Sequence, residues 1–101
     1  MDQVLVSEGE KIQTKKYVAN LFNVLTHLPP KAAMKLYGDL LTEQEAVRMA
    51  KRLEIAVCLL KGQSYRDIQG RLGVTPNTVS QIGRVLKTAG DGFKSARDLF
   101  L

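Results

Sequence analysis

The feature that most constrains the fold is a pair of short helix patterns that meet at a three-residue turn, Gly-Val-Thr at 73–75. The first pattern covers about 65–72 and has Ser64 as its N-cap. The second starts after Thr75, another good N-cap, with Pro76 at the first helical position, where a missing N–H costs little. Two helices this short have to share one small core. Its apolar members are Ile68, Leu72, Val74, Val79 and Ile82. The spacing predicts a helix-turn-helix within about residues 64–88.

The whole chain has helical periodicity, and no stretch alternates polar and apolar residues with the period of two that a strand requires. Proline and glycine mark the breaks between helices, most clearly at 29–30, 62, 73 and 90–92. The six expected helices cover about 11–28, 30–41, 43–61, 65–72, 76–88 and 93–101. The predicted fold class is therefore all-α, with a single helical domain over residues 1–101.

The third expected helix should be the central and most enclosed one, because apolar residues spread over more than one of its faces. Thr42 and Glu45 have the spacing of a capping box, which fixes its start. Ile55 and Cys58 fall elsewhere around the helix than its main apolar stripe. The main stripe consists of Val47, Ala50, Leu53, Val57 and Leu60, and Met49, Ala56 and Leu59 broaden it. Cys58 lies in an apolar run and is expected to be a buried structural thiol.

Positive charge is concentrated where the two short helices lie. The net charge of the chain is +5 and its pI about 9.6. The segment 61–88 alone carries five Lys/Arg residues against one Asp, a net charge of +4. Neutralisation of nucleic-acid phosphates predicts such clustering, although a solvated basic face has the same composition.

Other classes of function lack the residues they need. One cysteine, Cys58, excludes an internal disulfide and suits a reducing cytoplasm, and a single histidine leaves almost no zinc chemistry. The longest apolar run, 55–60, is far shorter than the roughly 20 residues of a membrane span. No glycine-rich loop follows a strand to cradle a phosphate. We therefore expect a cytoplasmic protein with no enzyme activity, cofactor, metal or membrane association.

The face of the second short helix that points away from the apolar residues is polar and suited to reading DNA. Asn and Gln side chains can bond an adenine edge, Arg can fork onto guanine, and threonines at a helix start can contact phosphate. The predicted DNA-binding residues are Arg66, Thr75, Asn77, Thr78, Ser80, Gln81, Arg84 and Lys87. The alternative is a helix-turn-helix that is only structural, in a protein-interaction or assembly module.

Several short motifs add to this pattern. They are Leu41-Thr42, Arg52-Leu53-Glu54-Ile55-Ala56, Leu60-Lys61-Gly62, Leu72-Gly73-Val74, Thr78-Val79-Ser80, Leu86-Lys87 and Gly90-Asp91-Gly92-Phe93. Together they resemble the Trp repressor superfamily, and its YerC/YecD-like branch most closely, over residues 41–93. The resemblance implies a six-helix Trp-repressor-like fold and an intertwined homodimer, in which the helices at about 11–41 interlock with the partner. It implies a DNA-binding transcriptional regulator, such as a repressor, whose two helix-turn-helix units read successive half-sites.

The resemblance also bears on a small-molecule effector. The best-known member of the family binds tryptophan, and Thr42 and Arg52 match two residues of its pocket, which makes them the candidate effector-pocket residues. At three other pocket positions, Gln81 stands for an arginine, Ile82 for a glycine and Val85 for a serine. The clamping guanidinium is thus missing, and the branched Ile82 should fill the space of the glycine. We expect that free tryptophan is not the effector.

Overall fold

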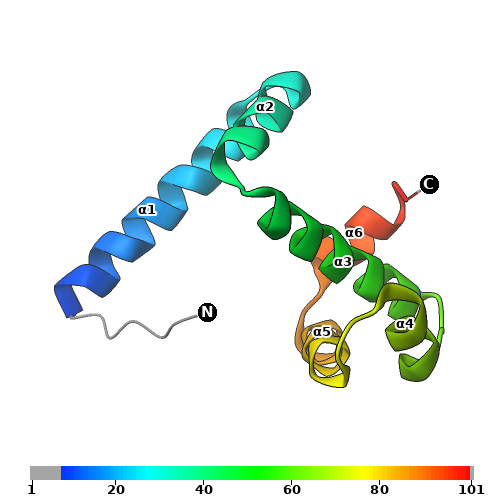
Figure 1. Ribbon diagram of the computed structural model, residues 1–101. Helices are drawn as coiled ribbons and strands as arrows, with labels where there is room; N and C mark the ends of the chain where they lie inside the picture. Colours follow the sequence, from blue (N-terminus) through cyan, green and yellow to red (C-terminus); the bar gives the residue numbers. More distant parts are fainter. Residues whose placement is uncertain (1–7, 101) are drawn as a thin grey trace. The chain divides into compact units, whose positions relative to one another are not determined.

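A computed structural model describes residues 8–100, which form six α-helices (Figure 1). Their bounds are α1 Glu8–His27, α2 Pro30–Leu40, α3 Glu43–Leu60, α4 Tyr65–Leu72, α5 Pro76–Thr88 and α6 Asp91–Arg97. The chain divides into two compact units, residues 1–40 with α1 and α2, and residues 41–101 with α3 to α6. The predicted all-α fold of six helices is confirmed. Within 8–100, no helix has the length and hydropathy of a membrane span.

The helices of the first unit carry apolar side chains that remain open to solvent. Helix α2 has no buried residue, and its Met34 side chain is 73% exposed. On α1, Phe22 belongs to the apolar stripe of the helix and is still 59% exposed. The exposed apolar residues of this unit are Ile12, Tyr17, Val18, Leu21, Phe22, Val24, Met34, Tyr37 and Leu40. The helices of this unit therefore leave much of their apolar side-chain surface uncovered among the described residues.

A capping box starts α3 where the sequence predicts it. The Thr42 hydroxyl accepts a hydrogen bond from the Glu45 N–H at 3.1 Å, and the Glu45 carboxylate accepts one from the Thr42 N–H at 2.9 Å. The bond from the Thr42 backbone is the main cause that lowers the pKa of Glu45 below its ordinary value. The ionised Glu45 therefore contributes fully to stability above the ordinary pKa of a glutamate. This contribution is lost as the pH falls through the lowered pKa of Glu45.

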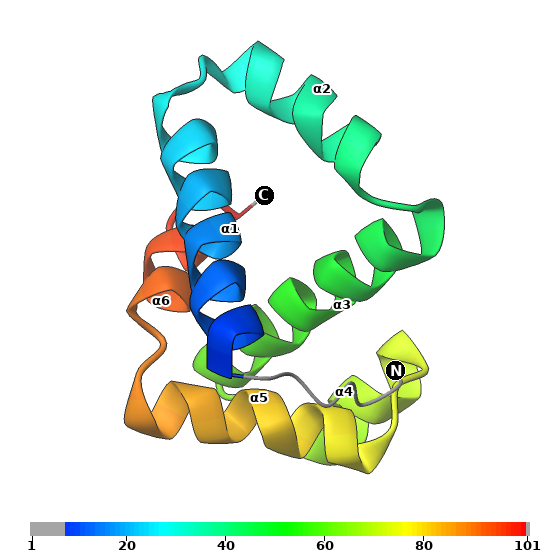
Figure 2. The ribbon, with the colours of Figure 1, turned by 90° about the vertical axis from the view of Figure 1, so that its left-hand side faces the viewer.

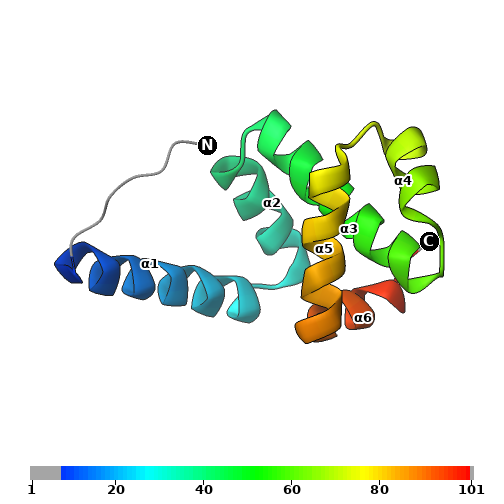
Figure 3. The ribbon, with the colours of Figure 1, turned by 90° about the horizontal axis from the view of Figure 1, so that it is seen from below.

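The core of the second unit lies at the carboxyl-terminal half of α3, where α4 and α5 pack against it. In Figures 1 and 3, α5 crosses α3 steeply, and Figure 2 shows α4 alongside α5. The buried residues of this core are Ile55, Ala56, Cys58, Ile68, Val79 and Ile82. Leu59, Leu72, Val74, Leu86 and Phe93 pack around them. The apolar residues predicted for the helix-turn-helix therefore share one core, and its central helix is α3, as expected.

The main apolar stripe of α3 is not buried in the first half of the helix. Val47 is 48% exposed and Ala50 is also exposed, whereas Ile55, which lies away from the main stripe, belongs to the core. The reason is that α3 has two apolar faces, and periodicity alone does not tell which face receives α4 and α5. Of the main stripe, only Val57 is fully buried. The predicted burial of Cys58 is confirmed.

Helix α6 begins two residues earlier than the sequence predicts. We expected 90–92 to be a turn before a helix at Phe93, but Asp91 and Gly92 are already helical. Gly90 is the N-cap, with a left-handed φ of 89°, and its carbonyl accepts the Lys94 N–H at 3.0 Å. The left-handed conformation of Gly90 changes the direction of the chain within one residue, so α6 starts without a longer turn.

Candidate nucleic-acid interface

The helix-turn-helix is fixed by local bonds at each of its helix ends. The Ser64 hydroxyl accepts the Asp67 N–H at 3.1 Å and starts α4. Gly73 ends α4 in the left-handed conformation, with φ 62° and ψ 40°, which a glycine adopts without strain. The Thr75 hydroxyl accepts the Thr78 N–H at 3.2 Å and starts α5. The predicted N-caps, turn and N1 proline are all confirmed.

A close approach between α4 and α5 depends on a glycine that the sequence analysis did not single out. Gly83 is buried on α5, and the Tyr65 hydroxyl lies directly against the position that a Cβ atom would take. Any larger residue at this position would displace the Tyr65 ring. The available signal in the sequence was a small residue on the inward face of α5 together with an aromatic residue at the start of α4.

The inward and outward faces of α5 differ in character. Val79, Ile82 and Gly83 are buried, and Asn77, Gln81 and Arg84 lie on the opposite side of the helix and are exposed. The other predicted DNA-binding residues of α5 differ in exposure: Lys87 is exposed, whereas Ser80 and also Thr78, which we expected on the outward face, are half-buried. Thr75 is the N-cap, and Arg66 is exposed on α4 rather than α5. The structure thus gathers seven of the eight predicted residues on α5 or at its start.

The cations of segment 61–88 do not all serve one surface. Arg71 donates a hydrogen bond to the sulfur of the buried Cys58 at 2.6 Å, which ties α4 to α3. The Lys61 ammonium lies over the Phe100 ring, 5.8 Å from its centre. Arg66, Arg84 and Lys87 are exposed and make no ion pair with the described residues. These three remain available to an anionic partner.

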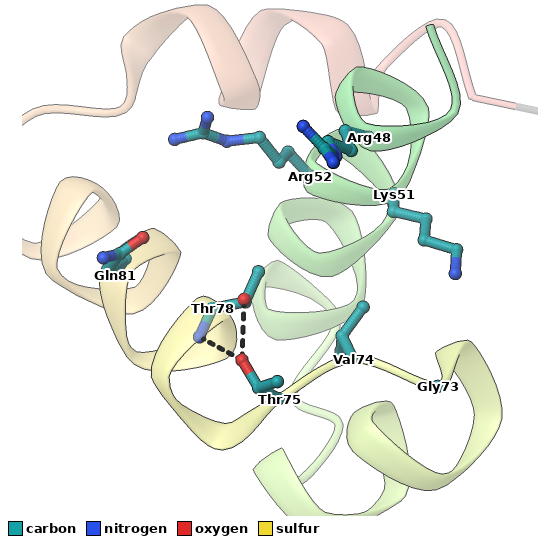
Figure 4. Close-up of a pocket in the computed structure, with 8 residues that line it drawn as sticks. All are labelled: Arg48, Lys51, Arg52, Gly73, Val74, Thr75, Thr78 and Gln81. Carbon is teal, nitrogen blue, oxygen red and sulfur yellow. Dashed lines mark hydrogen bonds between the residues drawn. The ribbon is translucent and has the colours of Figure 1, made fainter. Parts of the chain in front are cut away.

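A pocket of about 370 Å³ lies between α3 and the start of α5 (Figure 4). It is lined by Arg48, Lys51, Arg52, Gly73, Val74, Thr75, Thr78 and Gln81. Arg48 and Lys51 are not among the site residues predicted from the sequence. Arg48 lies four residues before Arg52, and Lys51 lies one residue before it. Arg48 and Arg52 are therefore on one face of the helix with Lys51 beside them, and this cluster of cations was the available signal in the sequence.

The residues of the candidate effector pocket are separated in this chain. Arg52 lines the pocket, whereas Thr42 caps α3 and is not among its lining residues. Ile82, which we expected to fill the space of the glycine, is 2% exposed in the helix-turn-helix core and is not among the lining residues of this pocket. Gln81 does line it, in the place that the resemblance gives to an arginine.

Comparisons with known proteins agree with this geometry. The profile of the Trp repressor protein family matches residues 11–98. The chain is also 31% identical over 84 residues to the uncharacterized protein YerC of Bacillus subtilis (strain 168), across 82% of this chain and 81% of YerC. No solved structure matches the chain significantly. The chain therefore belongs to the Trp repressor family of helix-turn-helix DNA-binding regulators, in the branch that contains YerC.

Proposed function

We propose that the protein is a sequence-specific DNA-binding transcriptional regulator that acts in the cytoplasm, as a repressor that occupies its operator. The observation that carries this proposal is the outward face of α5, where Asn77, Gln81 and Arg84 lie exposed while the inward face is buried. A helix presented in this way can enter the major groove, which admits an α-helix and displays a distinct pattern for each base pair. Exposed Arg66 and Lys87 would neutralise flanking phosphates.

In this proposal Arg84 reads a base, as a guanidinium does when it forks onto guanine. Replacing Arg84 by Ala is expected to weaken binding to the selected site by about 1–3 kcal/mol and to relax specificity at one base pair. Fluorescence anisotropy with the selected duplex and with single-base variants measures both effects. Lys94→Ala, which removes an exposed cation on α6, is the matched control and should leave the base preference unchanged. Equal loss on all duplexes would assign Arg84 to a phosphate instead.

We further propose that the active form is a homodimer. Support comes from the exposed apolar residues of α1 and α2, and from an apolar pocket of about 450 Å³ lined mainly by Met49, Ala50, Leu53 and Phe93. A second copy of the chain is the occupant that the family resemblance implies, and a symmetric pair buries the same surface on both copies. Two such copies would read half-sites roughly 34 Å apart. Light scattering should give twice the chain mass of 11.2 kDa, and a stable monomer would contradict the dimer.

Free L-tryptophan is not the effector in this proposal. Gln81 offers an uncharged amide where a guanidinium would clamp a carboxylate, and hydrogen bonds to such an amide are weaker than charge-assisted ones. We expect that added L-tryptophan leaves the DNA affinity unchanged in anisotropy titrations. A change of about fivefold or more, the lower end of allosteric coupling, would contradict this.

The experiment that tests the function uses gel shifts of the full chain with fragments of the host genome at two salt concentrations. Retardation of a subset of fragments at about 50 mM salt, weaker at higher salt, is expected of a DNA-binding regulator. Selection and sequencing of the bound fragments then identifies the operator. If no fragment is retarded at the lower salt concentration, the helix-turn-helix is structural and the alternative, a protein-interaction or assembly module, holds.

A further inference from the structure

We infer that the pocket between α3 and the start of α5 binds a phosphate group, with Arg48, Lys51 and Arg52 as its cationic wall. The phosphate has two possible sources, the backbone of bound DNA and a small molecule that carries a phosphate. For the first source the inference rests on the proposed function; for the second it stands by itself. With this assignment, Arg48 and Lys51 join Arg52, the α3 residue that the resemblance places in an effector pocket, in one ligand surface with the start of α5.

The charge of the pocket points to an anion. Three of its eight lining residues are cations and none is an acid, so its walls carry a formal charge of +3. None of the three cations forms a salt bridge with a carboxylate in the part of the chain that the structure describes. The charge of Arg48 is one of the causes that lower the pKa of Glu45, and the Glu45 carboxylate is held in the capping box at the start of α3. Three cations around one hollow repel one another, and a bound anion reduces this repulsion.

The uncharged part of the wall supplies hydrogen-bond donors. The hydroxyls of Thr75 and Thr78 lie 2.8 Å apart, and either one can donate to the other. In both arrangements one hydroxyl hydrogen remains that makes no bond within the pair, and it can be donated to a ligand. The Gln81 amide adds two more donor hydrogens on the same side. A phosphate, whose oxygens only accept, matches this set of donors.

The position and size of the pocket fit both sources. Figure 4 shows the cations on α3, with Thr75, Thr78 and Gln81 on the side of α5. The Arg52 and Lys51 side chains extend in opposite directions, so both must rotate toward the pocket to contact one phosphate. Because Gln81 also belongs to the outward face of α5, a duplex along that face would bring a backbone phosphate near the pocket. The volume of about 370 Å³ also lies in the range of pockets for small ligands, roughly 300–1,000 Å³.

One arm of the test uses no DNA. Sodium phosphate is titrated into the full chain at constant ionic strength, against sodium chloride, while amide NMR signals are recorded. Saturable shifts at Val74, Thr75 and Thr78 that are absent with chloride are expected for a small-molecule source. Arg48→Gln and Lys51→Gln should each weaken the apparent affinity at least about fivefold, in line with the loss of a charge-assisted bond. Lys94→Gln, on α6, should not.

The other arm measures DNA affinity over a series of salt concentrations for the same variants. If the phosphate belongs to DNA, Arg48→Gln and Lys51→Gln should each reduce the salt slope by about 0.9 per protomer, while Lys94→Gln leaves it unchanged. If the wild type binds DNA but neither variant changes the slope and phosphate causes no saturable shift, the inference is wrong and the proposed function stands. If the wild type binds no DNA, the proposed function fails, and the phosphate arm alone decides the inference.

Discussion

The affinity for the operator is expected to fall about 10,000-fold when the salt concentration rises from about 50 to 200 mM, because a dimer with about eight phosphate contacts has a slope near −7. The contacts are assigned at about four per half-site, from exposed cations such as Arg66 and Lys87 and from the start of α5. Anisotropy titrations at several chloride concentrations, plotted as the logarithm of affinity against the logarithm of salt, measure the slope directly.

The control for this prediction replaces added salt by sucrose at equal osmolality, which should leave the affinity nearly unchanged because no counterion is exchanged. The monomer alternative is distinguished by the same plot, because a single helix-turn-helix with about four contacts gives a slope near −3.6. A slope between 0 and about −1 would show that fewer than two phosphates are neutralised, and would contradict the assignment of the basic segment to DNA.

The second large effect concerns stability. Ile68 is completely buried where α4 meets α3 and α5, and its replacement by Ala is expected to cost about 2–5 kcal/mol in the free energy of unfolding. The loss has two parts. One is the favourable free energy of removing the deleted side-chain atoms from water, and the other is the cost of the cavity that remains among Ile55, Val79 and Ile82. Because small domains have only about 5–15 kcal/mol in total, chemical denaturation should show a much lower midpoint or an unfolded chain.

Two further variants keep this prediction testable if Ile68→Ala does not fold. Ile68→Val removes one methylene and should cost about 0.5–1.5 kcal/mol, which the domain can tolerate. Leu99→Ala changes a side chain that is 84% exposed and should stay within about 0.5 kcal/mol of the wild type. All variants are compared at one protein concentration, because the stability of a dimer depends on it. If Ile68→Val and Leu99→Ala lose the same free energy, the helix-turn-helix core is not where the structure has it.

Local signals in the sequence predicted most of the helix ends, because each depends on a few neighbouring residues. The capping box of Thr42 and Glu45, the N-cap Thr75 with Pro76 after it, and Gly73 at the end of α4 all occur as expected. The last helix was the exception at both ends, because α6 starts directly after Gly90 and ends at Arg97 instead of 101. The left-handed φ of Gly90 lets α6 start at once, whereas three turn-forming residues in a row favour a longer turn.

The candidate site could be predicted only in part. The polar face of α5 follows from helical periodicity once Val79 and Ile82 are taken as its inward side. Arg48 and Lys51 lie more than 20 residues earlier in the chain, and only the packing of α3 against α5 brings them to the pocket. Gly83 became significant in the same way, because Tyr65 lies against it in the folded unit.

The amino-acid sequence by itself determined the helices, their caps, the turn and the family, because these depend on residues close together in the chain or on the order of motifs along it. The tertiary structure decided which face of α3 is buried and which cations share a pocket with the start of α5. Helical periodicity marks two apolar faces on α3 with equal force. Only the fit of Ile68, Val79 and Ile82 against Ile55 and Cys58 selects one of them, and that choice places Arg48, Lys51 and Arg52 beside the turn.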